Sequence, residues 1–186
     1  MTVNRGHGDS ASCPLRLHIG GWEAREGWKI LNIQSRPGVD FVGNCRDLSR
    51  FADGSVAEIY SSHVYEHLSY RDEVVPALVE AFRVLRPGGL IRIGVPDLEA
   101  LCRMILDPKR SADCRYGAQS ILFGGQTDEF DYHKAGFTFD FLKQFLEGVG
   151  FRSVQRVKQF GLFNDTTSMV FEGVPISLNV SAMKPL

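Results

Sequence analysis

The sequence predicts one α/β domain built on a doubly wound, mostly parallel sheet of seven strands, closed by a C-terminal antiparallel hairpin. Short apolar runs alternate with longer amphipathic stretches, as in βαβ units around a parallel sheet. Residues 90–95 are almost all apolar, which is typical of a strand covered on both faces. No helical pattern separates the last two predicted strands, so they should pair antiparallel. The 186 residues fit a single domain.

The predicted strands are bounded by turn signals such as Gly20-Gly21 and Pro37-Gly38. They lie at residues 15–19, 29–33, 39–42, 56–61, 90–95, 153–159 and 176–183. Only about ten residues separate the first two strands, fewer than a full crossover helix needs. The first crossover helix is therefore expected to be shortened or missing.

Apolar residues at helical spacing predict helices at 71–85, 97–106 and 138–149. Pro76 fits the first of these only if the helix begins there or just before. Asp97 and Thr138 are the expected caps of the other two. Residues 111–135 show no readable pattern and are interpreted as a long loop, which in proteins is usually functional or disordered.

Composition excludes several classes of protein. The net charge of -1 gives no general attraction to nucleic acid or to an anionic membrane, and neither partner is expected. No apolar run approaches the ~20 residues of a membrane span. The four cysteines lack metal or redox spacing, which favours free thiols and a cytoplasmic location. Residues 1–13 are interpreted as a flexible polar tail before a single domain at 14–186; the oligomeric state stays open.

Three motifs carry a family resemblance: Val64-Tyr65-Glu66-His67-Leu68, the segment 82–89 (FRVLRPGG), and Gly94-Val95-Pro96-Asp97-Leu98. Together with residues 51–60 and 175–180 they resemble a short-chain branch of the type 11 group of class I S-adenosylmethionine (SAM) dependent methyltransferases. The resemblance covers about residues 15–185. It implies a Rossmann-like methyltransferase fold, SAM as the cofactor, and methyl transfer to a small-molecule or sugar-containing acceptor.

The resemblance also implies where the cofactor would bind. The family places glycines after the first strand, an acid after the second and another after the third. This chain has Gly20 and Gly21, then Asn32, then Asn44 with Asp47 as a possible substitute. Neutral hydrogen bonds contribute about 1 kcal/mol against about 1.5–3 kcal/mol for charged ones, so a weakened SAM site is expected.

His63 follows the fourth strand, where such proteins often contact cofactor or substrate, and a local cap is the alternative reading. His133 is the predicted catalytic base, oriented by Asp131 or Tyr132, because an imidazole titrates near neutral pH. An ordinary polar surface loop is the alternative there.

We expect structural roles for five other residues. Glu66 and His67 are expected to anchor the turn into the following helix. Trp22 and Trp28 are expected to pack over the gap left by the short crossover, with stacking on a ligand as the alternative. His18 is expected to be a core histidine. No metal is predicted, because the five histidines lack ligand spacing.

Two other functions relate to the same sequence features. A non-catalytic protein with this fold and a degenerate cofactor site, acting through protein partners, would explain the two asparagines at acid positions. A nicotinamide-dependent oxidoreductase is disfavoured because the G-x-G-x-x-G fingerprint and its downstream acid are absent.

Overall fold

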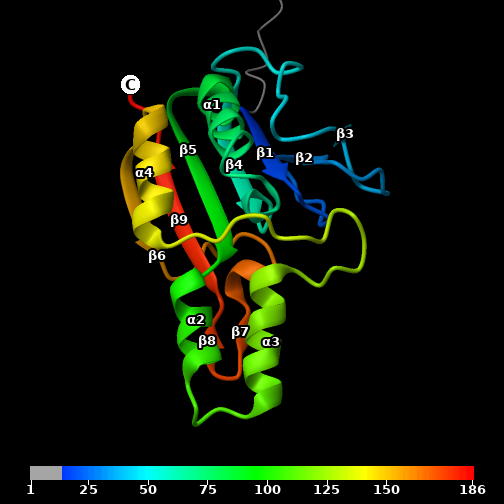
Figure 1. Ribbon diagram of the computed structural model, residues 1–186. Coiled ribbons are helices and arrows are strands. Elements are labelled where there is room, and N and C mark those ends of the chain that lie inside the picture. The colour runs from blue at the N-terminus through cyan, green and yellow to red at the C-terminus, as the bar shows by residue number, and fades with distance from the viewer. Residues whose placement is uncertain (1–13) are drawn as a thin grey trace, which may run out of the picture.

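The computed structural model describes residues 14–186, which form a seven-stranded sheet with flanking helices (Figure 1). The predicted tail, residues 1–13, lies outside the described residues. The strand order is β3-β2-β1-β4-β5-β9-β6. The strands of this sheet are β1 (Leu15–Ile19), β2 (Trp28–Asn32), β3 (Phe41–Val42), β4 (Val56–Ser62), β5 (Leu85–Pro96), β6 (Arg152–Val157) and β9 (Ser177–Met183).

The pairing directions confirm the mostly parallel sheet. Strands β1 to β5 pair parallel with one another. Strand β9 lies between β5 and β6 and runs antiparallel to both, so the expected C-terminal hairpin is confirmed. The third strand is shorter than predicted, because only Phe41 and Val42 pair with β2.

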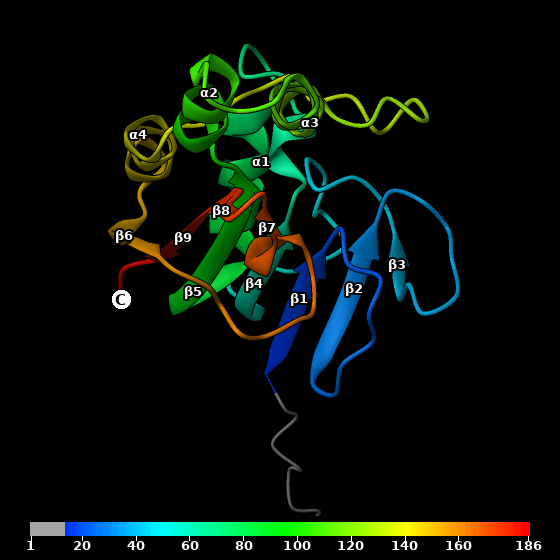
Figure 2. The same cartoon turned by 90° about the horizontal axis from the view of Figure 1, so that it is seen from below.

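Two helices cover one face of the sheet, α1 (Val74–Val84) and α4 (Phe139–Val149) (Figure 2). Their apolar stripes pack on alternate strand residues such as Leu17, Ile59 and Ile91 and form the largest buried cluster. Pro76 falls in the first turn of α1, as its missing N–H requires. Thr138 caps α4 by accepting a hydrogen bond from the Phe141 amide, as predicted.

The opposite face carries no α-helix within residues 14–186; the loop 158–169 crosses it instead (Figure 2). The first crossover, residues 20–27, contains no helix, which confirms that prediction. On this face Phe163 packs on Trp28 and Tyr60, with ring centroids 5.4 and 4.8 Å away. Trp28 therefore packs over the gap left by the short crossover, as expected.

A small second module lies beyond the carboxyl ends of the parallel strands (Figure 1). It contains α2 (Leu98–Leu106), α3 (Ala112–Phe123) and the hairpin of β7 (Val170–Phe171) and β8 (Val174–Pro175), and it has its own buried cluster. Asp97 caps α2 by accepting from the Ala100 amide, as predicted.

Helix α3 and the β7–β8 hairpin were not predicted, and α3 corrects the interpretation of residues 111–135 as one long loop. Its sequence is polar and contains Gly117, which lowers the helical signal. The glycine has a packing reason, because a Cβ there would lie 2.5 Å from the Phe171 ring.

None of the helices in the part of the chain described is long and apolar enough to cross a membrane. Cys45, Cys102 and Cys114 are free thiols, as predicted, and Cys13 lies outside the described residues.

Candidate cofactor and acceptor site

A cavity of about 540 Å³ opens at the carboxyl ends of β1, β2 and β4. Ligands of doubly wound sheets bind at this edge, and small-molecule pockets usually measure about 300–1,000 Å³. The residues after the strands line part of it, and residues 127–132 with Lys134 line another part. The lining includes Gly20, Trp22, Asn32, Gln34, Arg36, Asn44, Arg46, His63, His67, Asp128, Asp131, Tyr132 and Lys134.

The loop after β1 depends on both of its glycines. Gly20 has φ +78°, and a Cβ on it would lie 2.3 Å from Cγ2 of Val64. A Cβ on Gly21 would lie 2.4 Å from Nδ1 of His18, whose ring is buried directly beneath the loop. Burial lowers the pKa of His18 to about 4, so this histidine is a neutral core residue, as predicted.

Asn32 is buried at the end of β2 and holds two loops together. Its Nδ2 donates to the Gly21 carbonyl at 3.1 Å, and its Oδ1 accepts from the Gln34 amide at 3.0 Å. The side chain borders the cavity while both of its polar atoms are engaged within the protein.

Asn44 and Asp47 lie in different places relative to the cavity. Asn44 lines it, and its Oδ1 accepts from the Arg46 amide at 3.0 Å. Asp47 is exposed, accepts from the Ser49 amide at 3.0 Å, and is not among the lining residues. Of the predicted cofactor residues, the structure thus gathers Gly20, Asn32, Asn44 and His63 around one cavity. It leaves Gly21 and Asp47 outside the lining.

Trp22 lies at the edge of this cavity without filling it. Its side chain is about half exposed, and the Arg36 guanidinium lies over its ring, 4.0 Å from the centroid. Trp22 therefore does not pack over the crossover gap as Trp28 does. The cavity that a SAM site would need stays open.

A fully buried carboxylate, Glu66, lies behind the lining residues His63 and His67. It belongs to the short 3-10 turn η1 (Tyr65–His67) that follows β4. Nδ1 of His63 lies 3.1 Å from its Oε1, while Nε2 of the same ring lies 2.8 Å from Ser177 Oγ. Burial alone would raise the pKa of Glu66, but the neighbouring histidines, chiefly His63, more than offset it and hold the pKa below its ordinary value.

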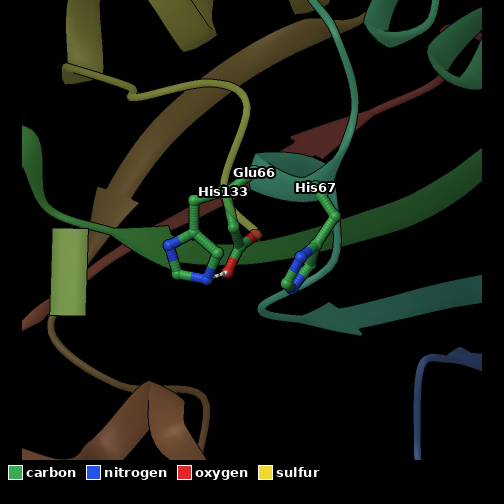
Figure 3. A group of neighbouring side chains, drawn as sticks. All are labelled: Glu66, His67 and His133. Atoms are coloured by element: carbon green, nitrogen blue, oxygen red, sulfur yellow. Dashed lines mark ion pairs between the residues drawn. The ribbon is translucent and has the colours of Figure 1, made fainter. Parts of the chain in front are cut away.

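Two more histidines surround the same carboxylate (Figure 3). Nε2 of His133 lies 4.0 Å from Glu66 Oε1, and the His133 and His67 rings meet edge to face with centroids 4.7 Å apart. Nδ1 of His133 lies 3.1 Å from the Leu122 carbonyl oxygen, and Nδ1 of His67 lies 3.1 Å from that of Tyr132. Burial lowers the pKa of His133.

The surroundings of His133 differ from those predicted. A main-chain carbonyl and Glu66 contact its ring, while the Asp131 carboxylate accepts hydrogen bonds from Thr127 and the Tyr132 carbonyl faces His67 instead. His133 lies behind the cavity wall, and His67 is the histidine of this pair that lines the cavity.

Sequence reasoning missed the central place of Glu66 among three histidines. Its backbone carbonyl accepts from the amides of Lys134 and Ala135, so it anchors a segment almost seventy residues away as well as the local turn. The His63 and Glu66 spacing of i,i+3 was a local signal for one of these contacts. No local sequence signal predicts that His133 lies beside Glu66 and His67.

Comparisons with known proteins agree with this geometry. Residues 25–93 match a family model described as a methyltransferase domain. No curated protein matches the chain in sequence.

Solved structures resemble it over most of its length. A SAM-dependent methyltransferase from Archaeoglobus fulgidus is 17% identical, with 93% of this chain and 87% of that chain covered and a TM-score of 0.58. The Burkholderia thailandensis 1,6-didemethyltoxoflavin-N1-methyltransferase, solved with its substrate and S-adenosylhomocysteine, is 16% identical, with 92% and 71% covered and a TM-score of 0.59.

A third match is a chain of the complex between the Haloferax volcanii Trm112 methyltransferase activator and a methyltransferase. It is 14% identical, with 94% and 84% covered and a TM-score of 0.57. At these identities the similarity establishes the fold, which is the Rossmann-like fold of class I methyltransferases.

Proposed function

We infer that this chain, whose family match and fold support a class I SAM-dependent methyltransferase with SAM as cofactor, transfers the methyl group to a small-molecule acceptor. The observation that carries this proposal is the open 540 Å³ cavity at the carboxyl ends of β1, β2 and β4. The acceptor that we propose includes sugar-containing molecules, as the family resemblance implies.

The two ends of the cavity suit different parts of the reaction. The adenosine and methionine groups would lie against Gly20, Asn32 and Asn44, where backbone groups and the Asn44 amide offer neutral hydrogen bonds. The acceptor would enter beside His67, residues 127–132 and Lys134, a wall that mixes aromatic and charged side chains. The B. thailandensis relative acts on a small molecule, which supports an acceptor of that class.

Methyl transfer from a sulfonium is an in-line displacement, so holding the two reactants in line and away from water supplies most of the rate enhancement. A proton acceptor is needed only where the attacking atom carries a proton. The assignment of His133 as that base stays a prediction. Because His133 lies behind the wall, a proton would have to reach it by way of His67 or after a local movement.

A non-catalytic role is the second candidate, and one observation favours it. Both polar atoms of the Asn32 side chain already form hydrogen bonds with Gly21 and Gln34, so fewer hydrogen-bonding groups are free to bind the ribose of SAM. The H. volcanii complex shows that a related fold can work with a protein partner. This alternative predicts a folded protein that does not bind SAM.

Calorimetric titration with SAM and S-adenosylhomocysteine separates the two. We expect binding in the micromolar to submillimolar range, with Asn44→Ala weakening it and Asp47→Ala leaving it unchanged because Asp47 lies outside the lining. SAM at a hundred times its dissociation constant should stabilise the fold by about 2.7 kcal/mol in a thermal shift assay. A folded protein that binds neither compound would refute the enzyme assignment.

A further inference from the structure

We propose that Glu66, His67 and His133 form a binding site for one divalent first-row transition metal ion in the wall of the cavity. The ligand atoms that these three side chains offer all lie within 4.8 Å of one another. Metal–ligand bonds of 2.0–2.2 Å in a tetrahedral site place neighbouring ligand atoms about 3.4 Å apart. Small side-chain rotations would therefore close the site around an ion (Figure 3).

The hydrogen bonds of His67 and His133 leave Nε2 of each ring free to bind a metal ion. In each ring Nδ1 lies 3.1 Å from a main-chain carbonyl oxygen, that of Leu122 for His133 and that of Tyr132 for His67. A carbonyl oxygen only accepts, so Nδ1 must carry the proton and Nε2 of the neutral ring has a free lone pair. Metal-binding histidines are usually held in this way, with the other ring nitrogen donating to a carbonyl or carboxylate.

The close partner of the Glu66 carboxylate is His63, whose Nδ1 lies 3.1 Å from Oε1, and not a lysine or arginine. Glu66 is fully buried, and no lysine or arginine among residues 14–186 pairs with it; the nearby Lys134 ammonium lies 3.4 Å from Glu73 instead. Apart from the His63 contact, its oxygens have no hydrogen-bond donor. Nε2 of His133 lies 4.0 Å from the same carboxylate, and a metal ion between them would interact favourably with both the buried negative charge and the nitrogen lone pair.

The ligand set indicates the kind of metal. Two imidazoles and one carboxylate suit Zn²⁺, Fe²⁺ and Co²⁺ better than Mg²⁺ or Ca²⁺, which prefer oxygen ligands. Three protein ligands also leave at least one coordination position open.

His67 lines the cavity, so the site borders the space assigned to the acceptor. If the proposed function holds, a metal there would act as a Lewis acid toward an acceptor oxygen, and His133 would be its ligand rather than the base. The metal site itself does not depend on that function.

Titration of chelator-treated, untagged protein with Zn²⁺ and with Co²⁺ tests the site. We expect one equivalent to bind, a rise in Tm, and a visible Co²⁺ spectrum of low-coordinate type. His67→Gln and His133→Gln should each weaken binding by about 100-fold or more, because each removes a ligand. Glu73→Gln is the matched control, since Glu73 is a neighbouring carboxylate outside the cluster, and its affinity should equal that of the wild type.

Circular dichroism checks that each variant folds, and His67→Gln keeps the test valid even if a change at the more buried His133 disturbs folding. The metal site is refuted if folded wild-type protein binds neither ion, or if both histidine variants bind as tightly as the wild type. SAM titration of the same samples keeps the two proposals apart. Metal binding without SAM binding would overturn only the proposed function, and SAM binding without metal binding would overturn only the metal site.

Discussion

The two faces of the sheet are built in different ways from the same strands. Toward α1 and α4, the strands present residues such as Leu17, Ile59 and Ile91, all fully buried or nearly so. Toward the loop 158–169, the alternate residues are His18, Tyr60 and other polar side chains. Among these, Arg92 and Glu58 form an ion pair.

The contrast shows what a missing helix changes. A helix covers a sheet with an apolar stripe, so the strand residues beneath it must be apolar too. A loop offers less apolar area and more polar groups, and the strands under it carry aromatic and polar side chains instead. We therefore expect the helix-covered face to supply most of the stability, while the loop-covered face supports the glycine loop of the cavity through His18.

The largest effect is expected on the helix-covered face. Leu78→Ala in α1 removes a fully buried side chain from the main cluster and should lower the free energy of unfolding by about 3 kcal/mol. Denaturant unfolding measures it. Val79→Ala on the same helix, about half exposed, is the control and should change stability by no more than about 0.5 kcal/mol. Equal losses in the two variants would contradict the difference between buried and exposed sides of α1.

Phe163→Ala tests the loop-covered face. The side chain is larger than leucine and almost buried, but it comes from a loop that can settle into the space left behind. We expect a loss of about 2 kcal/mol, at or below the lower end of the range for buried aromatic residues. A loss larger than that of Leu78→Ala would show that this face stabilises the domain as much as the other does.

His18 makes the loop-covered face sensitive to acid. Burial lowers its pKa from 6.5 to about 4, so between these values the unfolded chain binds a proton that the folded protein does not. Stability is therefore lost as the pH falls, by about 2 kcal/mol from this group between pH 7 and pH 5. Denaturant unfolding of the His18→Leu variant should show a loss of unfolding free energy between pH 7 and pH 5 that is about 2 kcal/mol smaller than in the wild type. An unchanged pH dependence would mean that His18 is not held neutral.

The smallest effect concerns the two asparagines. Asn32→Asp would place a carboxylate oxygen opposite the Gly21 carbonyl, where the amide now donates, so SAM binding should weaken by about 5- to 10-fold. Asn44→Asp keeps the acceptor for the Arg46 amide and is the matched control, with affinity unchanged or improved. Tighter SAM binding by Asn32→Asp would instead show that this position accepts a charged ribose contact despite the loop.

The parallel sheet, the final hairpin and three helices could be predicted because their signals are local. Asp97 and Thr138 cap their helices, and Pro76 marks a first turn. Helix α3 could not be predicted in this way, because it packs on residues distant in the chain, such as Leu101 and Phe171, and Gly117 weakens its local helical pattern.

The candidate site was predictable in part for the same reason. Gly20, Asn32, Asn44 and His63 each follow a strand whose carboxyl end reaches one edge, so their gathering around a cavity follows from topology. The environment of His133 depends on the fold bringing residues 122 and 133 next to Glu66, and no spacing in the chain encodes that contact.

The place of β9 has a consequence for biosynthesis. This strand fills the gap between β5 and β6, and the Lys184 ammonium just after it donates to the carbonyls of Phe82 and Leu85 at the end of α1. A nascent chain emerging from the ribosome thus leaves β6 unpaired until residues 177–184 are released. A partly synthesised sheet exposes unpaired strand edges. We therefore expect chaperones to bind the nascent chain in the interval before β9 pairs with β5 and β6.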